Sequence, residues 1–168
     1  MVMKRQLILF SAALLALCLL TVPAFGERST PDKGERCPVC GMFVAKYPQW
    51  LATLTVTDGK VLYFDGVKDM MAYYFAPADF GAGLEQRIEK IRVKDYYSQK
   101  WIDGKTAWFV VGSDVLGPMG HELIPFGSEV AAKSFLQDHR ANEILSFGDI
   151  DPGRIHTMRQ GHKMMKMK

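Results

Sequence analysis

Two cysteines in a Cys-x-x-Cys spacing carry the clearest chemical signal in this chain. Cys37 and Cys40 stand in the run Cys-Pro-Val-Cys-Gly-Met, and their spacing lets both sulfurs meet on one ion or on each other. A structural disulfide is one interpretation, although so short a loop makes a poor staple. A thioredoxin-like redox pair is a second, but no strand pattern precedes Cys37 and no helix pattern follows. Zinc usually takes four ligands, often from a second cysteine pair that this sequence lacks.

A copper(I) site is the third interpretation, because copper(I) needs only two or three soft ligands such as thiolates and thioethers. Met42 lies two residues after Cys40, while Met119 and His121 lie in a second, glycine-rich loop. The glycines that flank Met119 favour a tightly turned, exposed backbone that could offer the thioether to a metal. Core packing of the methionines and a surface position of His121 are the alternatives. The predicted metal ligands are Cys37, Cys40, Met42, Met119 and His121.

The end of the sequence is rich in histidine and methionine. Residues 151–168 also carry several basic side chains and show no pattern able to bury a core, so we expect them to be disordered. Such a segment fits weak collection of copper ions, and a basic tail that contacts anionic lipid is the alternative. The predicted secondary metal ligands are His156, Met158, His162, Met164, Met165 and Met167.

The first 26 residues are typical of an export signal. Lys4 and Arg5 precede an apolar run over residues 7–22, and Ala24-Phe25-Gly26 is a small-x-small cleavage motif. We therefore expect a periplasmic or other extracytoplasmic protein in which residues 27–36 form a linker. An uncleaved signal or a lipidated Cys18 would instead associate the chain with the membrane.

Charge and residue types exclude some classes of function. The 168 residues have a formal net charge of +3, which removal of the signal would lower to +1. This near-neutral charge argues against nucleic acid as a partner. Nothing in the sequence suggests a nucleophile with a base and an orienting group, so we expect no enzymatic activity.

Hydrophobic periodicity predicts the elements that must position these residues. Alternating apolar and polar residues predict strands over 51–57 and 61–64 around an Asp-Gly turn. A helix is expected to follow over 67–75, with Asp65 as its cap. Met70 and Met71 fit the inward face of this helix. Further strands are expected over 88–93, 106–111, 122–126 and 143–147, and a second helix over 129–139 that Ser128 caps.

The two halves of the chain resemble each other faintly. Residues 37–83 and 84–150 each read as a hairpin followed by a helix, entered through a loop that carries sulfur. We therefore predict an α+β fold of two similar small ββα-type units, with the metal site between them.

Several motifs, in their order along the chain, resemble the NosL family. The most specific are Cys37-Pro-Val-Cys-Gly-Met42 and Gly117-Pro-Met-Gly120 followed by Pro125-Phe126, and the resemblance runs from about Cys37 to Phe147. It implies a fold like that of the organomercurial lyase MerB, with two similar β/α units. It also implies that Cys40, Met42 and Met119 match positions that supply or neighbour the metal. Cys37 matches a position that is cysteine in only part of the family.

The resemblance further implies a copper(I) metallochaperone of the periplasm or outer membrane that supplies nitrous oxide reductase during denitrification. The expected partners are a copper ion and a recipient cuproenzyme or a membrane assembly complex. The main alternative is a periplasmic thiol-disulfide oxidoreductase with Cys37 as the attacking thiolate. Organomercurial cleavage is a weaker alternative, because fold does not fix function.

Overall fold

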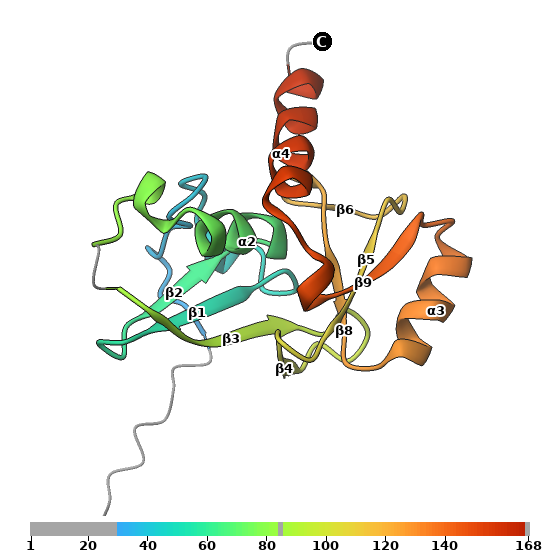
Figure 1. Ribbon diagram of the computed structural model, residues 1–168, viewed down its shortest axis with the longest axis horizontal. Helices are drawn as coiled ribbons and strands as arrows, with labels where there is room; N and C mark the ends of the chain where they lie inside the picture. The colour runs from blue at the N-terminus through green and yellow to red at the C-terminus, as the bar shows by residue number, and fades with distance from the viewer. Residues whose placement is uncertain (1–29, 84–85, 167–168) are drawn as a thin grey trace, which may run out of the picture.

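The computed structural model describes residues 30–83 and 86–166, and side chains as far as residue 160. Two main antiparallel sheets, with helices packed against them, make up these residues and confirm the α+β class (Figure 1). Within the described ranges, none of the helices combines the length and apolar character of a membrane span. The predicted export signal lies outside the described residues.

The first sheet has the strand order β2-β1-β3-β4 and is antiparallel throughout. β1 (Ala52–Val56) and β2 (Val61–Phe64) form the predicted hairpin, and Gly59 in its turn has a φ of +77° that favours glycine. β3 (Ile88–Lys94) and β4 (Trp101–Asp103) complete the sheet. Both strands follow residue 83, so this sheet extends past the boundary that the sequence pattern suggested. The similarity of the two halves stays a prediction.

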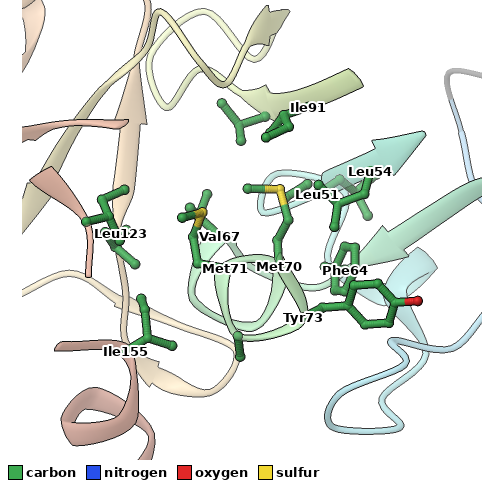
Figure 2. Close-up of a cluster of buried hydrophobic side chains, with 14 of the residues drawn as sticks. Leu51, Leu54, Phe64, Val67, Met70, Met71, Tyr73, Ile91, Leu123 and Ile155 are labelled. Atoms are coloured by element: carbon green, nitrogen blue, oxygen red, sulfur yellow. The ribbon is translucent and has the colours of Figure 1, made fainter. Parts of the chain in front are cut away.

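Helix α2 (Val67–Phe75) packs against the first sheet and has the bounds that the periodicity predicted (Figure 1). Its residues Met70 and Met71 are fully buried, as the sequence indicated. Figure 2 shows both methionine side chains within the main core, among apolar residues of the sheet and of the second half of the chain. The labelled neighbours include Leu51, Leu54, Phe64, Ile91, Leu123 and Ile155. Packing of this core therefore fixes the orientation of α2 relative to both halves.

The second sheet has the order β8-β5-β9, formed by β5 (Trp108–Val111), β8 (Ile124–Phe126) and β9 (Glu143–Ser146). Helix α3 (Glu129–Asp138) packs on it, and the Ser128 hydroxyl accepts a backbone N–H of the first helical turn, which confirms the predicted cap. In the part of the chain that the structure describes, the short 3₁₀ helices η1 (Val44–Lys46), η2 (Pro77–Phe80) and η3 (Phe147–Asp149) connect the elements.

A small hairpin carries the second glycine-rich loop. β6 (Leu116–Gly117) and β7 (Gly120–His121) pair antiparallel, which leaves Pro118 and Met119 at the tip of the turn. Gly120 has a φ of +80°, a left-handed conformation that L side chains rarely adopt. The turn therefore holds Met119 at a defined position.

The last helix corrects the expectation of a disordered tail. Helix α4 (Pro152–Lys166) occupies most of the segment predicted to lack structure and packs against α2 (Figure 1). The side chain of Ile155 is buried in the core, and Met158 packs against it. Ile155 and Met158 lie three positions apart, on the same face of the helix, and pack one turn of α4 against the core. Two apolar residues are too few to show as a periodic pattern in the sequence.

Candidate metal site

The Cys-x-x-Cys loop is folded back on itself by backbone hydrogen bonds. The Cys37 N–H donates to the Met42 carbonyl at 2.9 Å, and the Gly41 N–H donates to the Cys37 carbonyl at 2.9 Å. Gly41 has a φ of +77°, which explains the glycine at this position. Both cysteines are free thiols, with Cys37 buried and Cys40 half-buried. The loop therefore presents two sulfurs to the same side without joining them.

Two aspartates, Asp65 just before α2 and Asp69 in its first turn, lie beside these sulfurs. The Cys40 thiol lies 3.2 Å from Asp65 Oδ1, and the Cys37 thiol lies 3.8 Å from Asp69 Oδ2. One ligand atom from each of the four residues lies within 4.8 Å of all the others, a spacing that a single metal ion could bridge. The expected helix cap at Asp65 is wrong, because Gly66 is the N-cap and the Asp65 carboxyl faces Cys40.

The protonation of this cluster favours a metal ion as its partner. The hydrogen bond with Cys37, together with burial, raises the pKa of the Cys40 thiol. Burial also raises the pKa of Asp69. Asp65 Oδ2 is buried and accepts no hydrogen bond from the described residues. A bound cation would stabilise the charged forms of Cys40, Asp65 and Asp69. Bonds to the metal would offset the solvation free energy that the thiolate and the carboxylates lose on burial.

Lys68 lies in the first turn of α2, next to Asp69 in sequence. It joins this helix to the glycine-rich hairpin of β6 and β7. Its side chain is only 1% exposed, and its ammonium donates to the carbonyls of Met119 at 2.6 Å and His121 at 2.7 Å. Glu122 Oε1 in turn accepts the backbone N–H groups of Lys68 at 2.5 Å and Leu123 at 2.9 Å. This network holds the hairpin against the first turn of α2.

Glu122 gives the network a dependence on pH. Its burial raises the pKa of its carboxyl group to about 8, whereas the unfolded value is about 4.3. Between these two pKa values the folded protein keeps a proton that the unfolded chain loses. The free energy of unfolding should therefore fall as the pH is raised from about 5 to about 8, by on the order of 1 kcal/mol per pH unit. Glu122→Gln, which cannot ionise, should flatten this slope in urea unfolding. Equal slopes for both proteins would contradict the prediction.

A cavity opens beside the cluster. Its volume is about 330 Å³, and it is lined by Val39, Cys40, Lys68, Asp69, Met119, His156, Arg159 and Gln160. The structure thus brings Met119 from the hairpin and Cys40 from the first loop to one cavity. The Arg159 guanidinium of α4 lies 3.6 Å from Asp69 Oδ1, so a cation already faces this carboxylate.

The other predicted ligands are placed differently. Met42 is half-buried and His121 is exposed, and neither lines this cavity. In α4, His156 lines the cavity whereas Met158 packs against the core. The side chains of His162, Met164, Met165 and Met167 lie outside the described residues.

Sequence reasoning missed Asp65 and Asp69 as members of the site. Asp65 precedes the N-cap Gly66 and Asp69 lies in the first turn of α2, so helical periodicity gave no signal that pairs them.

The fold and the cluster define an α+β protein with a buried candidate metal site made of thiols and carboxylates. The family model NosL matches residues 28–155, and the chain therefore belongs to the NosL family. The copper-binding lipoprotein NosL of Stutzerimonas stutzeri is 28% identical over 127 residues, covering 70% of this chain and 62% of that protein. The chain thus spans less than two thirds of the length of this curated relative.

Two solved structures are also similar. The crystal structure of the copper chaperone NosL from Shewanella denitrificans has a TM-score of 0.63 at 24% identity, covering 73% of this chain and 93% of that one. The solution structure of apo-NosL from Achromobacter cycloclastes has a TM-score of 0.44 at 28% identity, covering 59% and 83% respectively. The first of these supports the fold. These relatives are described as a copper-binding lipoprotein and a copper chaperone.

Proposed function

We propose that this protein is an extracytoplasmic copper(I) metallochaperone that captures copper at the Cys37–Cys40 loop and releases it to a recipient cuproenzyme. The observation that carries the proposal is the convergence of two free thiols and two carboxylates within 4.8 Å at the edge of a cavity. Membership of the NosL family and the copper-binding names of its relatives support the same cargo.

Copper(I) suits the sulfur side of this site best. Thiolates and thioethers prefer soft ions, and the loop cysteines with Met119 would provide three sulfurs. Met42 is retained as an alternative third sulfur, and His121 as a nitrogen ligand that a movement of the hairpin would bring nearer. Asp65 and Asp69 would accept the protons that the thiols release on metal binding, or would hold the ion electrostatically.

Release would proceed by ligand exchange. A two- or three-coordinate ion leaves room for an incoming ligand to bind before an old one departs. The recipient would be a cuproenzyme such as nitrous oxide reductase, or a membrane complex that assembles it. The predicted export signal would place this chain outside the cytoplasm. The lipoprotein relative is consistent with a location outside the cytoplasm.

An anaerobic copper(I) titration of the reduced protein tests the proposal. The mature chain would compete with bathocuproine disulfonate for copper(I), and X-ray absorption would identify the ligands of the loaded form. We expect one tight site with two- or three-coordinate, sulfur-dominated copper(I). No tight binding, together with reduction of insulin disulfides by the same thiols, would instead assign the protein to the oxidoreductases.

Matched methionine variants decide which thioether binds. Met119→Leu keeps the shape of the side chain and removes its sulfur, so we expect copper(I) affinity to fall by about tenfold, which corresponds to about 1.4 kcal/mol. Met42→Leu should have a smaller effect, because Met42 does not line the cavity. Met70→Leu, in the core, serves as the control for a general loss of packing. Equal affinities for Met119→Leu and Met70→Leu would exclude Met119 as a ligand.

A further inference from the structure

Helix α4 contributes a histidine to the copper cavity from outside the family-matched region. The family model ends at residue 155, whereas His156 is the next residue along α4 and lines the same cavity as Cys40 and Met119. His156 is exposed, so it stands at the solvent side of the cavity, while Cys37 at the far side of the cluster is buried. The cavity lining therefore offers a thiol from Cys40, a thioether from Met119 and an imidazole from His156.

The imidazole of His156 contacts the side chain of Gln160 one helical turn later. The side-chain amide of Gln160 lies with its Nε2 at 2.7 Å from His156 Nε2. With the Gln160 amide nitrogen as donor, His156 Nε2 is the acceptor and the ring proton is on Nδ1. The lone pair on Nε2 is the one that a copper ion would use. Gln160 lines the cavity beside His156, so this hydrogen bond lies at the cavity itself.

Arg159 keeps this part of α4 in place. Its guanidinium pairs with Asp69 at 3.6 Å and lies 5.5 Å from the centre of the Phe80 ring. These contacts, with the buried Ile155 one turn earlier, fix the helix turn that bears His156 against α2. Tertiary contacts thus set the position of the helix turn that bears His156 beside the cavity.

We propose that Met119 and His156 form a transfer position for copper(I) at the mouth of the cavity, between the buried thiols and the solvent. The inference rests on the proposed function. During release, a bond from copper to His156 Nε2 forms before the bond to Cys40 breaks, and the Gln160 hydrogen bond is given up. Copper stays copper(I) throughout, so no electron donor or acceptor is required. Uptake follows the same steps in reverse.

Exchange kinetics with a chelator test the transfer position. Copper(I) would be moved from the loaded protein to bathocuproine disulfonate in a stopped-flow instrument, and loading would be followed separately. His156→Gln should slow uptake and release equally, by about tenfold, and leave Kd within about twofold, because only the barrier rises. His139→Gln is the matched control, since His139 ends α3 and pairs with Asp114 away from the cavity.

The outcomes separate this inference from the proposed function. Absence of tight copper(I) binding by the wild-type protein would refute the chaperone itself. Tight binding with unchanged exchange rates in His156→Gln, or with the same slowing in His139→Gln, would overturn only the transfer position. A weaker Kd with faster release would make His156 a ligand of the resting site and would likewise overturn it.

Discussion

Replacing both loop cysteines by serine is expected to weaken copper(I) binding by at least about a thousandfold, which corresponds to about 4 kcal/mol. A serine hydroxyl is a harder donor than a thiol and does not ionise near neutral pH, so Cys37→Ser/Cys40→Ser removes both thiolates at once. The two carboxylates would remain, and they do not hold copper(I) strongly by themselves. The measurement is the anaerobic competition titration with bathocuproine disulfonate.

The control for this variant is the integrity of the fold. Cys37 is 1% exposed and belongs to the core, so urea unfolding of the double variant must show a cooperative transition before its affinity is interpreted. Asp65→Asn/Asp69→Asn provides a matched comparison in the same cluster. It should reduce the affinity less than the cysteine variant does. An affinity of the folded serine variant equal to that of the wild type would place the copper site elsewhere in the chain.

Of the variants considered, Lys68→Met is expected to lower the free energy of unfolding most, because it removes a buried ammonium that donates two hydrogen bonds. The variant would leave the Met119 and His121 carbonyls without the ammonium that now donates to them. Each buried polar group that loses its partner costs about 1–3 kcal/mol, so the free energy of unfolding should fall by about 3 kcal/mol or more. Urea unfolding followed by tryptophan fluorescence measures this loss.

The same variant should also lower copper(I) affinity, since the hairpin that carries Met119 would lose its anchor on α2. Lys105→Met is the control, because Lys105 is exposed and its change should alter stability by less than about 0.5 kcal/mol. If Lys68→Met unfolds at the same urea concentration as Lys105→Met, the hairpin is held by its other contacts. A stability loss without a change in affinity would separate Met119 from the metal.

The sequence by itself determined the local parts of this protein. The bounds of α2 and the cap of α3 followed from periodicity and from residues that act within one helical turn. The Cys-x-x-Cys loop is also local, because a spacing of three residues with a following glycine lets the chain fold back on itself. The burial of Met70 and Met71 followed from the apolar face of their helix.

Only the tertiary structure decided how the site is completed. Asp69 lies 32 residues from Cys37, and Lys68 lies 51 residues from Met119, so no local pattern could pair them. Charged residues in the first turn of a helix look like a solvated surface or a cap until packing buries them. The same holds for α4, whose composition predicted disorder. Docking of Ile155 and the Arg159–Asp69 ion pair supply nonlocal contacts that stabilise a helix its own sequence does not specify.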